Sequence, residues 1–249
     1  MAIILLGGGY LLLHYTEDKK IAAESAKNSP QPVTSQKISV TAKNPSEEKK
    51  TAVATKNDLP SNVSLTDWDL QLVNQDHPIK KEPDDIVQFQ GLPVSKKIVP
   101  ALEKMFAAAK KENINLVVVS GYRSVDYQRQ LFQQSIDEAK AKGMNDEEAK
   151  KEALRYRTEP GTSEHHTGLA CDIIDTDWEV KDGSLEGAYG KTPGGVWLAN
   201  HGADYGFVVR YPEGKKAISH IEYEPWHMRY VGVENAQYMK KIIYVWKNM

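Results

Sequence analysis

Residues 160–172 read Pro-Gly-Thr-Ser-Glu-His-His-Thr-Gly-Leu-Ala-Cys-Asp, a glycine-containing loop that leads into an apolar run. Residues 169–174 predict a short buried strand, because apolar side chains dominate the run. Successive side chains of a strand point to opposite faces, so Asp172 should share a face with Ala170 and Ile174. A carboxylate between apolar neighbours is costly unless something neutralises it, and a divalent cation would do so.

A second unusual stretch, residues 222–227, reads Glu-Tyr-Glu-Pro-Trp-His. His227 from this stretch, with His165 and Asp172 from the first, would provide two imidazoles and one carboxylate. Such a set leaves one position of a tetrahedral zinc ion open, as catalytic rather than structural sites do. Glu224 precedes His227 by one short turn of chain, where its carboxylate can act as a base without binding the metal. The two stretches therefore predict a catalytic zinc site.

These segments resemble the D-alanyl-D-alanine carboxypeptidases of the VanY and LdcB types, which are zinc peptidases with the fold of the hedgehog signalling domain. The family pattern S-x-H-x(6)-D is met by Ser163, His165 and Asp172. The pattern E-x-W-H is met by Glu224, Trp226 and His227. Further similar segments are residues 120–124 with Gln128, residues 74–78 and residues 205–212, so that the resemblance spans about residues 68–233.

The resemblance implies a function for each matching position. One zinc ion would be held by His165, Asp172 and His227, with Glu224 as general base and then acid, Arg123 at the developing oxyanion or the substrate, and Ser163 and Gln128 as substrate contacts. The implied reaction removes the terminal D-alanine of peptidoglycan stem peptides, with D,D- or L,D-specificity, by attack of zinc-activated water. His166 is adjacent to His165 and could be taken for the ligand, but the family spacing favours His165.

Two other functions are compatible with the same motifs. One is a non-catalytic domain of this fold that binds cell-wall peptides, although such a domain would not need Glu224. The other is an endopeptidase that cuts peptidoglycan cross-bridges with the same metal chemistry. Nothing in the sequence distinguishes an open cleft from one that is closed beyond the scissile bond, so the endopeptidase stays an alternative.

The bulk composition excludes several classes of protein. There are 32 Lys and Arg against 34 Asp and Glu, so the chain has no positive excess that would favour nucleic acid as a partner. A single cysteine, Cys171, excludes an intramolecular disulfide and every zinc site built on paired cysteines. Cys171 should face away from Asp172 among apolar residues, which predicts an inert core position rather than a nucleophile.

The N-terminal part has the composition of a targeting segment and a tether. Residues 1–15 are mostly apolar, and the length of the run suits a signal peptide or membrane anchor. Residues 16–60 contain no aromatic residue and predict a disordered tether, and residues 61–249 the zinc carboxypeptidase domain. We therefore expect an extracytoplasmic monomer, anchored in the membrane or secreted to the bacterial cell wall. It would touch the membrane through its N-terminal segment only and bind peptidoglycan stem peptides.

The hydrophobic periodicity predicts an α+β domain. Apolar residues at helical spacing in residues 95–112 indicate a helix, and Pro100 places its start near Val99. Further helices are expected at 126–142, 146–156, 196–205 and 233–246, and strands at 115–120, 169–174, 207–210 and 220–223. Helices and strands do not alternate regularly enough for a doubly wound sheet. The resemblance implies a small antiparallel sheet flanked by helices.

Overall fold

The computed structural model describes residues 60, 63–64, 66–154 and 157–247. These residues belong to one compact unit, Pro60–Met249. The predicted anchor, residues 1–15, and nearly all of the predicted tether, residues 16–60, lie outside the described residues. Within the described part, no helix is both long and apolar enough to cross a bilayer.

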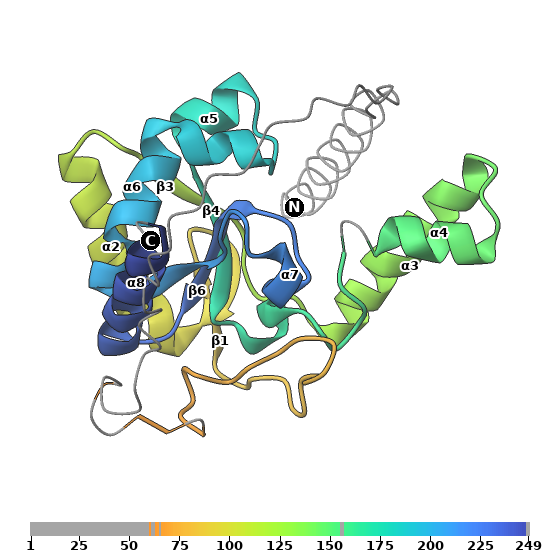
Figure 1. Ribbon diagram of the computed structural model, residues 1–249, viewed down its shortest axis with the longest axis horizontal. Helices are drawn as coiled ribbons and strands as arrows, with labels where there is room; N and C mark the ends of the chain where they lie inside the picture. Colours follow the sequence, from red (N-terminus) through yellow and green to blue (C-terminus); the bar gives the residue numbers. More distant parts are fainter. Residues whose placement is uncertain (1–59, 61–62, 65, 155–156, 248–249) are drawn as a thin grey trace, which may run out of the picture. The chain divides into compact units, whose positions relative to one another are not determined.

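The centre of the unit is a four-stranded antiparallel sheet with the strand order β3-β4-β6-β5 (Figure 1). Its strands are β3, Leu116–Ser120; β4, Ala170–Asp175; β5, Phe207–Tyr211; and β6, Glu224–Tyr230. The two central strands, β4 and β6, carry Asp172 from the first motif and Glu224 and His227 from the second. The expected class, α+β with a small antiparallel sheet flanked by helices, is confirmed.

Helices cover one face of this sheet and build the apolar core there. They are α2, Val99–Lys111; α6, Pro193–His201; and α8, Val233–Lys247. Cys171 and Ile173 of β4 and Met228 of β6 point into this core, and all three are fully buried. Because side chains alternate along a strand, Asp172 and His227 leave the sheet on the opposite face. The sheet thus separates the apolar core from the polar site.

A short ribbon of β1, Ile86–Phe89, and β2, Leu92–Ser95, was not expected from the sequence. The two strands pair in antiparallel register around Gln90 and Gly91, whose φ angles are 51° and 83°. Left-handed backbone at both central residues is the geometry of a type I′ hairpin turn. Strands this short do not show a hydrophobic period in the sequence, so only the turn residues indicate the hairpin.

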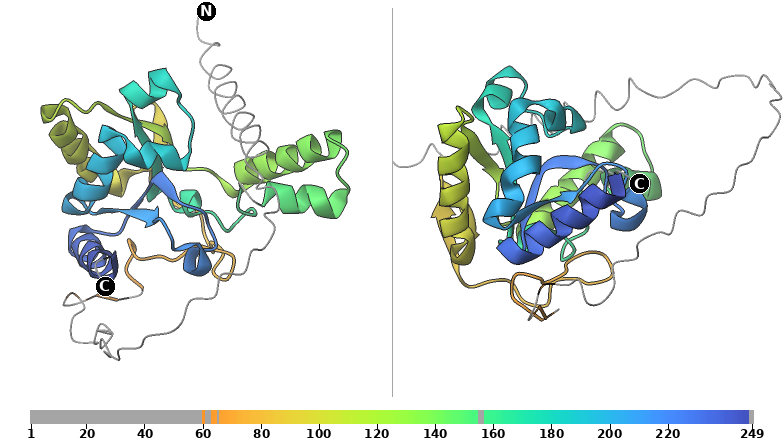
Figure 2. Two further views of the ribbon diagram at one scale, coloured as in Figure 1. Left: turned by 45° about the horizontal axis from the view of Figure 1, so that its top comes forward. Right: turned by 60° about the vertical axis from the view of Figure 1, so that its left-hand side comes forward.

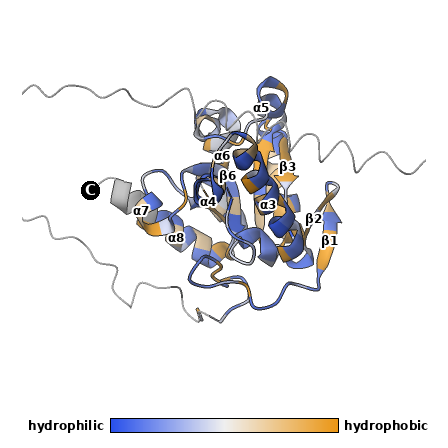
Figure 3. Ribbon diagram, turned by 90° about the vertical axis from the view of Figure 1, so that its right-hand side faces the viewer, coloured by the Kyte–Doolittle hydropathy of each residue, from blue (hydrophilic) through white to orange (hydrophobic). Residues whose placement is uncertain are grey.

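Helices α3, Val125–Ala141, and α4, Asp146–Ala153, form a hairpin that projects from the rest of the unit (Figures 1 and 2). Ser124 caps α3, and Asn145 with Glu148 forms a capping box at α4. The outer surface of α3 is mostly hydrophilic, whereas apolar residues are conspicuous in β1 and β3 (Figure 3). The hairpin begins directly after the segment that contains Arg123, which connects it to the site.

The sequence-based boundaries are right for most elements and wrong at the start of the second motif. The helix expected at 126–142 and the closing helix are observed within one residue of the expected bounds. The strand expected at 220–223 is absent, because these residues form a bend after α7, Lys216–Ser219, and β6 starts only at Glu224. Short elements complete the described fold: η1, Lys96–Ile98; η2, Glu164–Thr167; α5, Thr176–Lys181; η3, Gly187–Lys191; and η4, Gly202–Tyr205.

Candidate active site

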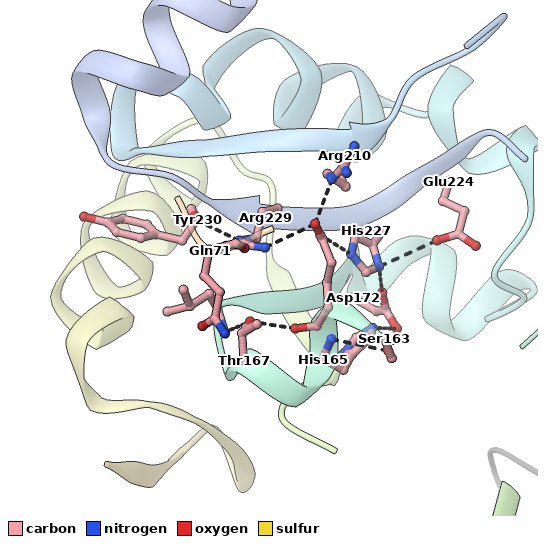
Figure 4. A network of polar contacts seen from close by, with 12 residues as sticks. Gln71, Ser163, His165, Thr167, Asp172, Arg210, Glu224, His227, Arg229 and Tyr230 are labelled. Carbon is pink, nitrogen blue, oxygen red and sulfur yellow. Dashed lines mark hydrogen bonds and ion pairs between the residues drawn. The ribbon is translucent and has the colours of Figure 1, made fainter. Parts of the chain in front are cut away.

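The three predicted metal ligands come from two neighbouring strands and one short helix. Asp172 in β4 is paired directly with His227 in β6, and His165 lies in η2, which contacts β4. One ligand atom from each residue lies within 4.8 Å of the others, and all three residues are buried. Figure 4 shows the three side chains turned toward one another beneath the sheet. The structure therefore brings together residues that are far apart in the chain.

Hydrogen bonding determines which nitrogen of His165 faces the site. Its Nδ1 lies 2.7 Å from the carbonyl oxygen of Gly121, which accepts a hydrogen bond. The Nδ1 atom therefore carries the hydrogen of a neutral ring. The other nitrogen, Nε2, lies 3.3 Å from Oδ2 of Asp172 and keeps a lone pair for a ligand.

The side chains of His227 and Asp172 present ligand atoms that suit a cation. Nδ1 of His227 lies 3.2 Å from Oδ1 of Asp172. This oxygen is buried and accepts no hydrogen bond within the described residues. A buried carboxylate oxygen without a partner is costly, and a bound cation would remove that cost. Two imidazoles and a carboxylate are a zinc donor set with an open fourth position, so these residues fit a zinc ion.

The two histidines differ in charge because their surroundings differ. Burial lowers the pKa of His165 to about 4, which leaves its imidazole neutral at pH 7. Burial also opposes charge on His227, but the neighbouring carboxylates of Asp172 and Glu164 outweigh it and raise the pKa of His227 to about 9. Burial alone would raise the pKa of Asp172, yet the neighbouring histidines hold it well below its usual range. The carboxylates around His227 therefore stabilise positive charge on that ring, whereas His165 stays neutral.

Glu224 lies at the edge of this cluster as the first residue of β6. Its Oε2 is 3.6 Å from Nδ1 of His227, and its side chain is 26% exposed, in contrast to the fully enclosed ligands. Burial raises its pKa to about 7, and the positive charge of His227 partly opposes the shift. A partly exposed carboxyl group with a pKa near neutrality, beside a candidate metal site, can take up and release a proton.

Arg123 follows β3 directly, and its guanidinium is anchored by α3. Its Nη1 donates a hydrogen bond of 3.0 Å to Oε1 of Gln128, whereas its Nε has no partner within the described residues. Burial lowers its pKa, and the carboxylates of Asp172 and Glu224 oppose the shift. The guanidinium therefore lies close enough to these carboxylates to share a site with them, and it retains an unused donor.

The two expected substrate contacts have intramolecular partners. Gln128 is buried in α3, where its Oε1 accepts from Arg123 and its Nε2 donates to the carbonyl oxygen of Thr158 at 2.8 Å. Ser163 is also buried, and its Oγ accepts from the backbone N–H of His165 at the start of η2. Gln128 thus supports the guanidinium of Arg123, and Ser163 supports the backbone of His165.

Four further residues around His227 had no role assigned from the sequence, although the motifs and similar segments include the first three of these: Glu164, Arg210, Tyr211 and Arg229. The ring of Tyr211 lies 4.8 Å from that of His227, between centroids. Arg210 and Arg229 both form ion pairs with Glu164, whose carboxylate reaches His227. No periodicity or motif predicts these contacts with Glu164. Two arginines in strands near the second motif could have suggested a buried carboxylate as their partner.

Comparisons with known proteins agree on one family. The family model for VanY, D-alanyl-D-alanine carboxypeptidase, matches residues 92–233. A D-alanyl-D-alanine carboxypeptidase of Enterococcus faecalis is 37% identical over 174 residues, which cover 68% of this chain and 61% of the relative. The chain thus spans about three fifths of the length of the curated relatives that it matches first.

Two solved structures are similar in both fold and sequence. A mutant of the vancomycin resistance D,D-pentapeptidase VanY from the VanB-type cassette, in complex with Zn(II), is 34% identical with a TM-score of 0.60. The match covers 70% of this chain and 94% of that one. The LD-carboxypeptidase LdcB is 35% identical with a TM-score of 0.61, over 70% of this chain and 81% of that one.

Proposed function

Because the chain belongs to the VanY family of D-alanyl-D-alanine carboxypeptidases, we propose that it removes the terminal D-alanine of peptidoglycan stem peptides at a single zinc ion. The observation that carries the proposal is the buried group of His165, Asp172 and His227 beside the partly exposed carboxylate of Glu224. A wall-peptide-binding domain would have no use for a proton acceptor at that position. The conjunction of metal ligands and base therefore favours catalysis.

The metal would be held by Nε2 of His165, Nδ1 of His227 and the carboxylate of Asp172. The other ring nitrogens are already in contact with the protein: Nδ1 of His165 with Gly121, and Nε2 of His227 with Glu164. When bound, zinc supplies a Lewis acid that polarises the scissile carbonyl and the attacking water. The unpartnered Oδ1 of Asp172 supports this assignment.

The protein side chains supply the proton transfers and a positive charge. Glu224 takes a proton from water while the oxygen of that water attacks the scissile carbonyl carbon. It then delivers that proton to the nitrogen of the departing D-alanine, so the carboxylate is regenerated when the peptide bond breaks. Arg123 offers its charge and its free Nε–H to the carbonyl oxygen or to the terminal carboxylate of the substrate.

The decisive experiment is mass spectrometry of defined stem peptides incubated with the full chain. Tetra- and pentapeptide stems are both used, because the similar solved structures include a D,D-pentapeptidase and an LD-carboxypeptidase. Loss of one alanine that a chelator abolishes and zinc restores is expected. The substrate that reacts reveals whether the enzyme is D,D- or L,D-specific. No chelator-sensitive product from either stem would contradict the proposal, and cleavage within a cross-bridged dimer alone would indicate an endopeptidase.

Assembled peptidoglycan lies outside the cytoplasmic membrane, so action on its stem peptides would require the enzyme to be there. Residues 1–15 would act as signal or anchor and residues 16–60 as the tether of a monomeric domain at 61–249. A tether of this composition lets the domain search several tens of ångströms from the membrane. Protease treatment of protoplasts should remove the domain if it is anchored on the outer side of the membrane. Protection from protease until lysis would contradict this location.

A further inference from the structure

Glu164 is a buried carboxylate that the proposed reaction does not use. It lies between Ser163 and His165, at the position that the family pattern S-x-H leaves open. Its side chain is 1% exposed. Burial of an ionised carboxylate costs free energy unless partners compensate, so its environment requires an explanation.

Two arginines occupy one oxygen of this carboxylate. Oε1 of Glu164 accepts a hydrogen bond of 2.7 Å from Nε of Arg210 and lies 3.1 Å from Nη1 of Arg229. Arg229 is itself held by the carbonyl oxygens of Asp69 and Gln71, at 3.2 and 2.7 Å from its Nη2. The position of the glutamate is therefore determined from several sides. Figure 4 shows Arg210 on β5 and Arg229 on β6, the strand that also carries His227.

The second oxygen is directed at a metal-ligand candidate. Oε2 of Glu164 lies 3.4 Å from Nε2 of His227. An ionised carboxylate can only accept, so Nε2 of the ring must carry the hydrogen. The lone pair of a neutral His227 is then on Nδ1, which faces Asp172 across the β4–β6 pair.

We propose that Glu164 is the positioning residue that selects the Nε2–H tautomer of His227 and aims its Nδ1 at the metal. Arg210 and Arg229 hold the carboxylate in the orientation that this requires. The inference rests on the proposed zinc site, but it concerns how the ligand is oriented rather than which bond is cut. Carboxylates that orient a ligating histidine typically change metal affinity by 10–100-fold when they are replaced.

The variant Glu164→Gln tests this orientation with little change in volume. Its amide oxygen should turn to the two arginines, which leaves its NH₂ group facing Nε2 of His227. The amide N–H and the Nε2–H of His227 would then face each other, which favours the tautomer of His227 with its hydrogen on Nδ1. Zinc affinity, measured by competition with a chelator, should fall by about 10–100-fold. The absorption spectrum of the cobalt(II) form should also change.

A matched control separates this effect from the general loss of a charge. Glu159 is a half-exposed carboxylate paired with Lys150 at 2.8 Å, outside the metal site. Glu159→Gln should leave zinc affinity and the cobalt spectrum as in the wild type. Glu164→Gln with wild-type affinity and an unchanged cobalt spectrum would overturn the inference while leaving the proposed function intact.

A measurement on the wild type does not depend on the folding of any variant. In the zinc-loaded, ¹⁵N-histidine-labelled protein, His227 should carry its hydrogen on Nε2 and have its Nδ1 bound to the metal. The opposite arrangement would refute the role of Glu164. Failure of the wild type to bind zinc at all would instead refute the proposed function, and the inference with it.

Discussion

Nδ1 of His166 lies 2.7 Å from the backbone carbonyl oxygen of Arg123, while Nε2 of the same ring accepts from the N–H of Gly161 at 3.1 Å. Both nitrogens of this fully buried ring are therefore occupied. The backbone N–H of Arg123 donates in return to the carbonyl oxygen of His165 at 3.2 Å. Of two adjacent histidines, one thus fixes the backbone of the arginine and the other retains a nitrogen for a metal.

This division of roles predicts different outcomes for the two alanine variants. His165→Ala should lose stoichiometric zinc, because it removes a ligand atom. His166→Ala should keep one zinc per chain but lower the free energy of unfolding by about 1–3 kcal/mol, because buried partners lose their hydrogen bonds. Metal analysis of the purified variants and denaturant titration measure these effects. Zinc loss in the His166 variant alone would reverse the assignment.

Replacement of Glu224 by glutamine should abolish turnover while sparing the metal. Glutamine cannot take a proton from water at neutral pH, and general acid–base catalysis typically contributes about 10²–10⁴-fold. Glu224→Gln should therefore lower kcat by at least that range, with zinc content and peptide affinity retained. The control is Glu222→Gln, since Glu222 is exposed and pairs with Lys216. Release of D-alanine at the wild-type rate by the Glu224 variant would contradict its role as base.

Replacement of Gln128 should act through Arg123. Gln128→Leu removes both the acceptor for the guanidinium and the donor to Thr158, so Arg123 loses its fixed orientation. We expect kcat/KM to fall by about 10–100-fold, since misplacement by 1 Å can cost about 10²-fold. Gln133→Leu on the same helix is the matched control, because this glutamine is exposed and its amide donates to Asp137 at the surface. Equal activity of the two variants would exclude a positioning role for Gln128.

A methyl group at Gly121 should disturb both the fold and the metal site. A Cβ atom there would lie 2.1 Å from the carbonyl oxygen of Pro93 in β2. The end of β3, which Gly121 directly follows, would have to move away from β2. The carbonyl oxygen of Gly121 would move with it, and that oxygen orients His165. Gly121→Ala should cost about 1–3 kcal/mol of stability and weaken zinc binding.

The control for this substitution is Gly187→Ala. A Cβ atom at Gly187 meets only Tyr223, at an ordinary contact distance of 3.4 Å. Thermal denaturation and chelator competition on both variants provide the comparison. Wild-type stability and zinc affinity in the Gly121 variant would show that the strand end adapts without effect on His165.

Local features of the sequence determined the class of site and most of the regular elements. The residue types at His165, Asp172, Glu224 and His227 predicted a catalytic zinc site, and the family resemblance implied a peptidase. The structure places these four side chains together. The long helices were predictable because an apolar stripe repeats at helical spacing over many residues. These signals depend on neighbours in the chain, so one sequence is enough to detect them.

Only the tertiary structure decided how the site is supported. The sequence predicted a strand at 220–223, whereas the observed strand is Glu224–Tyr230, because pairing with β4 and β5 defines its ends. The contacts of Glu164 with Arg210 and His227 join residues separated by 46 and 63 positions. Hydrogen bonds over such separations leave no periodic trace in the sequence. The candidate metal ligands could thus be predicted from motifs, whereas the groups in contact with them became visible only once the sheet had brought them together.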